Sequence, residues 1–446
     1  MIEVNKIHEG NCLEVLKTFP DNSIDSCVTD PPYGISFMNK HWDYQVPSVE
    51  VWNEILRVLK PGGYLLCACG TRTQHRMAVN IEDAGFEIRD VITWVYGSGF
   101  PKSMDISKAI YKQSGVNRTE IPVGNPVKRM IPGADQNNTG SWIKDNGKVY
   151  QPVISSPASD KAKEWEGWGT ALKPACEFWT LARKPISENT VADNVLKFGT
   201  GGINIDECRI EFVSDKDFDS ATFGRGTNII GGNYVGATHG NVKTNIEANR
   251  KGRFPANLIH DGSEEVLKVF PKTDGAFAPV KSGHNGDSKG IYGDYAQRGD
   301  DGLTFYGDSG SAARFFYCAK ADNYEREKGL EKGFEEKHVR RDDGQPYGMN
   351  TNKFRPDGSE RKEVAARKNN HPTVKPIDLM RYLVKLITKK GGICIDPYCG
   401  SGTTLVGCKL ELINYIGIER EAEYIKIAEA RVKAWNPDKY ITQTLF

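Results

Sequence analysis

Four consecutive residues near the amino terminus carry the clearest chemical signal in the chain: Asp30, Pro31, Pro32 and Tyr33. They follow the β-prone run 24–29, which predicts a buried strand that ends in a sharp turn. A carboxylate, a backbone carbonyl and an aromatic ring on a rigid proline corner could hold a planar heterocycle by its exocyclic amine. The alternative is a simple strand-ending turn, because proline fixes φ and aspartate favours turns.

A second signal lies near the carboxyl terminus, where residues 396–402 read Asp-Pro-Tyr-Cys-Gly-Ser-Gly between a predicted strand and a predicted helix. Glycines there let the backbone approach a ligand, and the helix amides face it. The ending of a phosphate loop is missing, and the glycine spacing differs from the dinucleotide fingerprint. Glu419 ends the next predicted strand, where a carboxylate can bind ribose hydroxyls. We expect a nucleoside with a small charged group; the alternative is a glycine turn that only packs helix against strand.

The segments around both motifs alternate between strand and helix patterns. Near the amino terminus we predict strands at 24–29, 64–69 and 86–96, helices at 49–59 and 71–84, and a turn at 60–63. Near the carboxyl terminus we predict helices at 377–388, 403–410 and 422–434 and strands at 393–395 and 415–419. This alternation predicts an α/β fold with a doubly wound, mostly parallel sheet. Shorter sheet-forming segments are predicted at 176–182, 254–259 and 313–318.

The composition is that of an ordinary globular protein. The 446 residues are 38% hydrophobic and 26% charged, and the net charge is +1, so a bound polyanion would need a local basic patch. Neither a signal peptide nor a membrane-spanning length of apolar residues is evident, so we expect a cytoplasmic protein without a membrane contact. The 10 cysteines form no Cys-x-x-Cys pair, and we predict no metal site.

Taken together, the two motifs resemble those of the S-adenosylmethionine-dependent DNA amino-methyltransferases. The similarity is strongest to the β group, in which the catalytic motif precedes the cofactor motif. A third segment, His371-Pro372-Thr373-Val374-Lys375-Pro376, matches the residues that precede the cofactor loop in that group. Two positions depart from the family pattern: Tyr398 replaces the usual Phe, and Asn11 replaces an Asp that holds the adenine amine. An Asn oxygen can still accept that hydrogen bond, without the charge.

The resemblance implies a class I methyltransferase sheet that is circularly permuted and carries long insertions. Residues 1–111 would form the catalytic half, 166–210 a sheet segment, and 366–446 the cofactor-binding half. Residues 112–165 and 211–365 are rich in Gly, Asn, Ser, Asp and Lys, and would be insertions, the second one a target-recognition region.

The resemblance also assigns roles to single residues. Asp30 and the Pro31 carbonyl would hold the amine of a base flipped out of the duplex, Pro32 would stiffen the turn, and Tyr33 would stack on the base. Asp30 would also stabilise the charge that develops on nitrogen. The cofactor set comprises Asn11 for adenine, Glu419 for ribose, Gly400, Ser401 and Gly402 for the methionine part, His371, Thr373 and Lys375 on the opposite side, and Asp396 and Tyr398 in the loop. No metal is needed.

The implied partner is double-stranded DNA. Candidate phosphate contacts are Lys128, Arg129, Arg250, Lys251 and Arg253, with a looser basic stretch of Lys353, Arg355, Arg361, Lys362, Arg367 and Lys368. Such charges are equally typical of a solvated surface. Trp142, Trp165 and Trp168 could stack on bases or belong to the core. A homodimer is compatible with the sequence, which does not identify a restriction partner or the recognition site.

Several activities remain open at this point. Asp at position 30 favours adenine-N6 methylation, whereas cytosine-N4 enzymes more often have Ser there. Methylation of RNA or of a protein amide is a further class, although its tetrapeptides more often begin with Asn. A DNA-binding protein that has lost catalysis is the last alternative, and the intact tetrapeptide and glycine turn argue against it.

Overall fold

The structure is a computed structural model that describes residues 2–35, 43–99, 103–114, 120–122, 127–128, 149–150, 153–155, 159–222, 249–274, 309–320, 323–336 and 367–438. The chain divides into two compact units. The first contains Met1–Gly97, Cys176–Glu335 and Lys368–Phe446, and the second contains Ser98–Ala175 and Glu336–Arg367. Both sequence motifs belong to the first unit.

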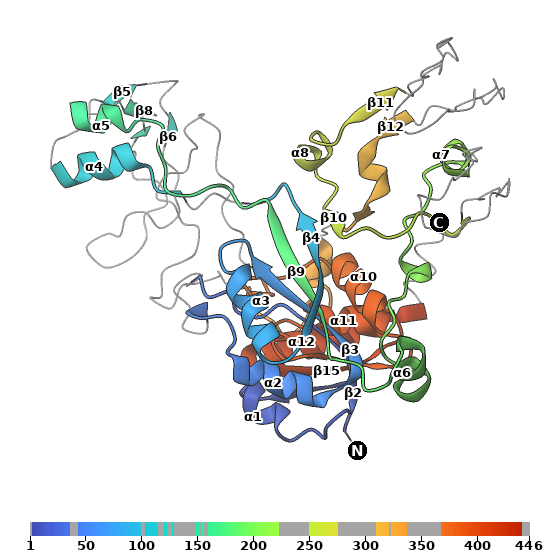
Figure 1. Ribbon diagram of the computed structural model, residues 1–446. Helices are drawn as coiled ribbons and strands as arrows, with labels where there is room; N and C mark the ends of the chain where they lie inside the picture. The colour runs from blue at the N-terminus through green and yellow to red at the C-terminus, as the bar shows by residue number, and fades with distance from the viewer. Residues whose placement is uncertain are drawn as a thin grey trace, which may run out of the picture. The chain divides into compact units, whose positions relative to one another are not determined.

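A nine-stranded sheet organises the first unit, with the strand order β1-β15-β14-β2-β3-β9-β4-β10-β13 (Figure 1). Its strands are β1 (Lys6–Glu9), β2 (Ile24–Thr29), β3 (Leu59–Gly70), β4 (Glu87–Val95), β9 (Cys176–Arg183), β10 (Leu258–His260), β13 (Tyr317–Cys318), β14 (Ile393–Asp396) and β15 (Asn414–Glu419). All neighbouring strands are parallel except β9, which runs antiparallel to both β3 and β4. The predicted α/β fold with a mostly parallel sheet is therefore confirmed, while the circular permutation stays a prediction.

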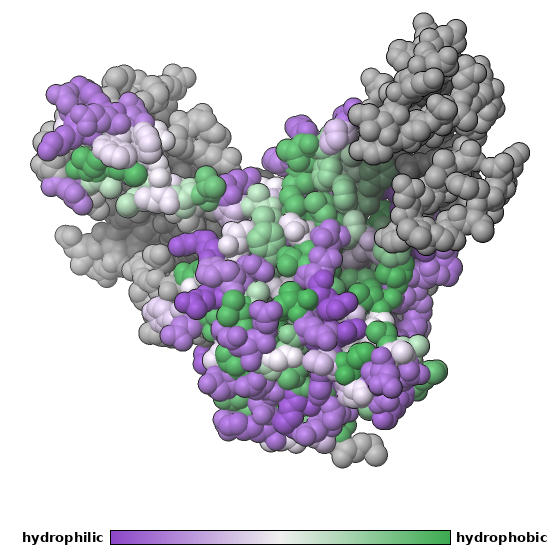
Figure 2. Space-filling model, viewed as in Figure 1, coloured by the Kyte–Doolittle hydropathy of each residue, from purple (hydrophilic) through white to green (hydrophobic). Residues whose placement is uncertain are grey.

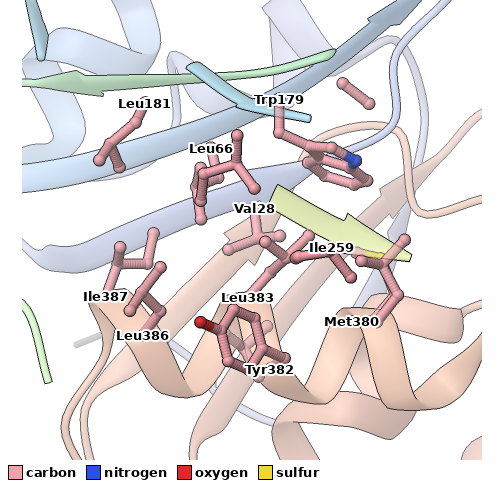
Figure 3. Close-up of a cluster of buried hydrophobic side chains, with 14 of the residues drawn as sticks. Val28, Leu66, Trp179, Leu181, Ile259, Met380, Tyr382, Leu383, Leu386 and Ile387 are labelled. Carbon is pink, nitrogen blue, oxygen red and sulfur yellow. The ribbon is translucent and has the colours of Figure 1, made fainter. Parts of the chain in front are cut away.

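Helices cover both faces of this sheet, as a doubly wound fold requires. Alternate residues of β3 point to opposite faces: Leu66 and Ala68 belong to one buried cluster, and Leu65 and Cys67 belong to another. The first cluster includes α10 (Ile377–Ile387), whose apolar side chains lie below Val28, Leu66 and Trp179 in Figure 3. The second includes α2 (Val49–Val58) and α3 (Gln74–Asp83).

The remaining helices are shorter or lie nearer the sheet edges. In the first unit they are α1 (Cys12–Leu16), α6 (Val191–Phe198), α7 (Asp215–Thr222), α8 (Glu264–Leu267), α9 (Asn323–Glu327), α11 (Thr403–Leu410) and α12 (Ala422–Ala434), with 3-10 turns at Asp206–Cys208 and Ala312–Phe315. Figure 2 shows mainly hydrophilic residues over the surface formed by α1 and α2. A two-stranded pair, β11 (Lys272–Asp274) with β12 (Ser309–Ser311), completes this unit.

The second unit contains helices α4 (Ile106–Ser114) and α5 (Asp160–Glu164). It also contains two antiparallel pairs, β5 (Glu120–Pro122) with β8 (Val153–Ser155) and β6 (Val127–Lys128) with β7 (Val149–Tyr150). Across the described ranges of both units, no helix is long and apolar enough to cross a membrane. Within the same ranges, no group of three or more His, Cys, Asp or Glu residues could hold a metal ion.

Most predicted helices and strands are confirmed to within a few residues, and three predictions need correction. Residues 60–63 were expected to form a turn but lie inside β3, at a shift in register opposite Ile24 and Ser26. Gly62 adopts φ 77°, so the extra residues form a bulge within the strand. Of the segments 254–259 and 313–318, only the last two residues of each belong to a strand, because the preceding residues form a loop and a 3-10 turn. The proposed five-part division of the chain stays a prediction.

Candidate active site

The carboxyl ends of four neighbouring strands bring the predicted site residues to one edge of the sheet. In the order β1, β15, β14 and β2, Asn11 follows the first strand, Glu419 ends the second, the turn 396–402 begins with the last residue of the third, and Asp30 follows the fourth. From β2 the chain passes through α2 to β3, whereas from β14 it passes through α11 to β15 on the other side. The connections therefore diverge between β14 and β2, and crevices at such switch points are where open α/β sheets bind ligands.

A buried hydrogen bond joins the two motifs directly. Thr29, the last residue of β2, donates from Oγ1 to Asp396 Oδ1 at 2.7 Å. The Tyr398 amide also donates to Oδ1, and the Thr404 hydroxyl donates to Oδ2. Burial raises the pKa of Asp396 to about 6, although the hydrogen bonds from Thr404 and Thr29 oppose this shift. Both oxygens of Asp396 thus bind groups of the protein, which fits a residue that shapes the turn from within.

We call residues 29–34 the catalytic corner. Its Asp30 carboxylate accepts a hydrogen bond from the Tyr33 hydroxyl at 2.7 Å and a second one from Lys375 Nζ, also at 2.7 Å. The backbone of the corner is fixed by Asp43, whose Oδ1 accepts hydrogen bonds from the amides of Tyr33 at 2.6 Å and Gly34 at 2.9 Å. Asp43 is buried and had no recognisable sequence signal, because it lies outside the motif.

The Tyr33 ring packs against the end of β3. A Cβ atom placed on Gly70 would lie 3.2 Å from Tyr33 Cδ2, so the glycine makes room for the ring. The Thr73 hydroxyl donates to the Tyr33 carbonyl at 2.6 Å. Burial, and then the Asp30 charge, raise the pKa of Tyr33 well above its usual range, so its hydroxyl keeps the proton that it donates. Tyr33 therefore supports Asp30 here, and its stacking on a base stays a prediction.

Lys375 was expected on the cofactor side, and the structure places its ammonium in the catalytic corner. Besides Asp30, it lies 3.2 Å from Tyr33 Oη and 3.2 Å from Glu177 Oε2. Burial lowers the pKa of Lys375, but the Asp30 and Glu177 charges outweigh burial and raise it overall. Glu177 lies in the predicted sheet-forming segment 176–182, where the sequence analysis gave it no role. It is the functional candidate that the sequence analysis missed.

We call residues 396–402 the cofactor turn. Gly400 and Gly402 adopt φ 49° and 78°, a region that side chains rarely adopt. A Cβ atom on Gly402 would lie 2.8 Å from Ala428 Cβ, and one on Gly400 would lie 2.6 Å from His371 Nε2. Both glycines thus allow close packing within the protein. The same turn ends at Gly402, the N-cap of α11, so its backbone also lies at a helix amino terminus.

A buried arginine supports the cofactor turn from α12. The Arg431 side chain is fully buried and donates from Nη1 to the Ser401 carbonyl at 2.6 Å, to Ser401 Oγ at 3.2 Å and to Thr403 Oγ1 at 3.0 Å. Burial, and then the Arg326 charge, lower its pKa to about 10, so it remains charged at neutral pH. No sequence pattern singles out Arg431, because a basic residue on a surface helix usually faces solvent.

Glu419 and Asn11 also bind backbone groups. Glu419 accepts the Gly400 amide at 2.9 Å through Oε2, and the amides of Arg420 and Glu421 at 2.8 Å through Oε1. Burial raises the pKa of Glu419 despite these bonds. Asn11 is exposed and caps α1 by accepting the Leu13 amide at 3.0 Å. Glu419 Oε2 and Asn11 Oδ1 each accept one of these bonds and keep a second lone pair, so the contacts are compatible with the predicted ribose and adenine contacts.

The segment that carries His371 and Thr373 lies against the cofactor turn. The His371 ring packs edge-on against Tyr424 with ring centroids 4.6 Å apart, and its Nδ1 accepts the Thr373 amide. Arg326 of α9 donates to the His371 carbonyl. Burial, followed by the charges of Arg326 and Arg431, lowers the pKa of His371 to about 3, so its ring is neutral. Thr373 is exposed.

Two of the basic residues in the run 250–253, which were expected to contact phosphates, pair with acidic side chains of the protein itself. Arg253 forms hydrogen bonds of 2.8 and 2.7 Å to both oxygens of Asp217, and Lys251 pairs with Asp206 at 3.0 Å. The Arg253 guanidinium also lies over the rings of Phe212 and Phe315. Arg253 thus stabilises this part of the fold, and its role as a phosphate contact stays a prediction, as does that of the exposed Arg250.

Other DNA-contact candidates are distributed between described and undescribed parts of the chain. In the second unit Trp165 and Trp168 are 41% and 60% exposed and pack edge-to-face. Lys368 contacts Glu327 through its amide and the Glu331 carbonyl through Nζ. The candidates whose side chains lie outside the described residues are Lys128, Arg129, Trp142, Lys353, Arg355, Arg361 and Lys362.

Comparison with known proteins identifies a family that matches more than half of the chain and curated relatives that match short segments of it. The model of the DNA methylase family N6_N4_Mtase matches residues 24–123 and 266–430, which include both the catalytic corner and the cofactor turn. The chain is 43% identical over 79 residues to the Type II methyltransferase M2.DpnII of Streptococcus pneumoniae, covering 18% of this chain and 30% of that protein. It is 38% identical over 81 residues to the Type II methyltransferase M.HinfI of Haemophilus influenzae, covering 18% and 23%. The matches thus span less than a third of these curated relatives.

Two solved structures align along most of their length at low identity. The M1.HpyAVI–SAM complex matches with a TM-score of 0.35 and 14% identity, covering 96% of this chain and 98% of that one. The PvuII DNA methyltransferase, described as cytosine-N4-specific, matches with a TM-score of 0.39 and 12% identity, covering 99% and 92%. The family match alone includes more than half of the residues, on both sides of the switch point. The chain belongs to the N6/N4 DNA methylase family.

Proposed function

We propose that this protein transfers a methyl group from S-adenosylmethionine to the exocyclic N6 of adenine in DNA. The observation that carries this proposal is the adjacency of the catalytic corner and the cofactor turn. They follow neighbouring strands, β2 and β14, and the 2.7 Å hydrogen bond from Thr29 to Asp396 joins them. A methyl donor bound at one and an amine bound at the other would lie side by side, and holding reactants together supplies a large part of many rate enhancements.

The cofactor side has the groups that a charged nucleoside requires. The Glu419 carboxylate is half-buried at the end of β15, where it suits ribose hydroxyls, and Asn11 follows the adjacent strand β1. The amino terminus of α11 follows Gly402 and favours a carboxylate such as that of methionine. When bound, S-adenosylmethionine supplies an electrophilic methyl group on a sulfonium.

The catalytic corner would activate the amine. An exocyclic amine is a weak nucleophile because its lone pair is delocalised into the ring. Hydrogen bonds from its two N–H groups to Asp30 and to the Pro31 carbonyl would favour a pyramidal nitrogen with a free lone pair. The Asp30 carboxylate would then stabilise the positive charge that develops on that nitrogen. Pro32 keeps the corner rigid, and the base must leave the duplex to reach it.

The choice of adenine rests on Asp30, since cytosine-N4 enzymes of this kind more often have Ser at that position. DNA as the substrate is supported by the family and by the Type II methyltransferases among the relatives. The test is to incubate the purified chain with S-adenosylmethionine and genomic DNA, and then digest the DNA to nucleosides for mass spectrometry. We expect N6-methyladenine. Detection of N4-methylcytosine alone would show that cytosine, not adenine, is the target base. Methyl transfer to RNA but not to DNA would reject DNA as the substrate.

A further inference from the structure

Glu177 has a half-buried carboxylate to which neither the sequence motifs nor the proposed mechanism gives a role. It is the second residue of β9 and pairs with Gly70 of β3 and Trp94 of β4. Because β9 runs antiparallel to both neighbours, its first residues lie beside their last residues. That is the edge of the sheet at which Asp30 follows β2. The direction of a single strand therefore brings Glu177 into the active site.

Lys375 lies between two carboxylates. Its ammonium is 2.7 Å from Asp30 Oδ2 and 3.2 Å from Glu177 Oε2, and the three side chains are only 9%, 15% and 16% exposed. The shorter contact is a hydrogen bond, and the longer one lacks hydrogen-bond alignment. With both acids ionised the cluster carries one net negative charge, and with Glu177 protonated it is neutral. Opposite charges interact strongly at such distances when they are shielded from water.

Whether the Lys375 ammonium pairs with Asp30 alone or is shared with Glu177 decides how strongly Asp30 can bind an amine. Both Asp30 oxygens already accept a hydrogen bond, one from Tyr33 and one from Lys375. An ammonium paired with Asp30 alone would neutralise the carboxylate and weaken its attraction for an N–H group or for a developing positive charge. A second carboxylate that shares the ammonium restores the negative potential at Asp30.

We propose that Glu177 is a positioning residue for methyl transfer, which competes with Asp30 for the Lys375 ammonium and so keeps the Asp30 carboxylate available to the substrate amine. This inference rests on the proposed function and deepens it. Replacement of Glu177 should therefore change the rate of transfer more than it changes cofactor binding.

Among the ionisable groups around Glu177, Glu177 itself is the one whose protonation should change the charge of the cluster in acid. The ionisable groups that face it are Asp30 and Tyr33 after β2, Lys375 before α10, Cys69 on β3, Tyr96 after β4 and Cys176 on β9. Burial raises the pKa of each thiol and phenol in this set, to about 11 for Cys69, so these groups are neutral in acid. Burial also raises the pKa of Glu177, while the Lys375 charge opposes the rise. Glu177 thus takes up its proton at a higher pH than an ordinary glutamate.

The first experiment needs neither cofactor nor DNA. In the full chain labelled with ¹³C at the glutamate carboxyl carbons, the signal absent from Glu177→Gln identifies Glu177. We expect it to titrate above the range of the exposed glutamates, and to titrate higher still in Lys375→Met, because the opposing positive charge is gone. A Glu177 signal with an ordinary midpoint, or one that Lys375→Met leaves unmoved, overturns the proposal.

The second experiment measures transfer to DNA as a function of pH. Glu177→Gln should lower kcat by about tenfold, the effect of one pKa unit of lost charge stabilisation, and leave the KM for S-adenosylmethionine unchanged. The wild type should lose activity as acid protonates Glu177, and Glu177→Gln should lack this step. Glu177→Asp should restore part of both. Glu87→Gln is the matched control, because Glu87 pairs with Arg183 at the other end of β9 and should keep the wild-type rate and pH profile.

The two proposals fail in different ways. A wild-type chain that methylates no DNA rejects the proposed function, and the carboxyl titration still decides whether Glu177 and Lys375 are coupled. An active wild type with an equally active Glu177→Gln, or with the same acid step in both, rejects the role of Glu177 alone. A loss of folding without any change in the rate per folded molecule would also reject it.

Discussion

The catalytic corner and the cofactor turn follow neighbouring strands, yet different kinds of contact hold them. In the catalytic corner the Asp30 carboxylate binds two side chains, Tyr33 from within the corner and Lys375 from a distant part of the chain. In the cofactor turn the contacts are close glycine packing and buried hydrogen bonds from Arg431 to Ser401. The first set can be exchanged for bonds to a substrate. The contacts of the cofactor turn cannot be broken without disturbing the turn.

This difference separates two kinds of preorganisation. The catalytic corner keeps a charged group satisfied in the absence of substrate, by partners that an amine can partly replace. The cofactor turn keeps a fixed shape through packing against α12 and the segment at His371. We therefore expect substitutions in the corner to reduce transfer without loss of folding, and substitutions in the turn to reduce stability and cofactor binding together.

The largest expected effect is that of Asp30→Ala. It should lower the rate of transfer by roughly 10³-fold, because it removes both the acceptor for the amine and the charge that stabilises the transition state. Binding of S-adenosylmethionine, measured by calorimetry, should largely persist, since Glu177 still compensates Lys375. Asp21→Ala is the control, because its exposed carboxylate pairs with Arg57 before the start of β2, at the end of that strand opposite Asp30, and its loss should leave the rate unchanged. A fully active Asp30→Ala would refute the catalytic assignment.

Arg431→Met tests the other side of the comparison. It should lower the free energy of unfolding by about 3 kcal/mol, because Ser401 and Thr403 lose a buried donor. Affinity for S-adenosylmethionine should fall with it, because the turn loses its support. Arg420→Met removes an exposed arginine that pairs only with its neighbour Glu421 among the contacts described, and should change neither quantity appreciably. Denaturant titration and calorimetry measure both. Unchanged stability in Arg431→Met would contradict the buried network.

Much of the fold could be predicted from the sequence because its strands and helices are strongly patterned. The runs that became β2 and β14 are short and β-prone, and the run that became α10 carries apolar residues at helical spacing, so their bounds were nearly right. The bulge at 60–63 was mistaken for a turn because proline and glycine mark both. The direction of β9 has no local signal, since strand pairing depends on distant partners.

The site residues that belong to sequence motifs could be predicted. Those that only the fold brings to the site could not. Asp30 and Glu419 could be found because strand ends collect functional residues in parallel sheets. Glu177 reaches the site at the beginning of a strand, and only an antiparallel strand places its beginning at that edge. Asp43 and Arg431 act on backbone groups of the motifs from other segments, so only tertiary structure reveals them.

A pair of glycine substitutions isolates packing in the cofactor turn from backbone strain. Gly402 and Gly391 both adopt φ 78°, but a Cβ atom on Gly391 meets nothing within 4 Å, whereas one on Gly402 meets Ala428. Gly402→Ala should therefore destabilise the protein by about 2 kcal/mol more than Gly391→Ala does. It should also weaken cofactor binding, which Gly391→Ala should spare. Thermal denaturation of both variants measures the difference, and equal losses would mean that strain, not packing, requires glycine at 402.

The smallest expected effect is a pH dependence of stability that His371 contributes. Its pKa is lowered from 6.5 to about 3 by burial and then by Arg326 and Arg431, so the folded state favours the neutral ring. The unfolded chain binds the extra proton first as pH falls, and the His371 contribution is present above 6.5 and lost between 6.5 and about 3. The maximum slope is about 1.4 kcal/mol per pH unit. The raised pKa of Asp396 acts in the opposite direction, so the measurement compares the wild type with His371→Asn, whose side-chain oxygen can still accept the Thr373 amide. Denaturant titrations at pH 7 and at about pH 5 should show a smaller acid loss in the variant. An equal acid loss of stability in the wild type and the variant would mean that the His371 ring is solvated. The contrast between a catalytic corner with replaceable contacts and a cofactor turn with a fixed shape would then be weaker.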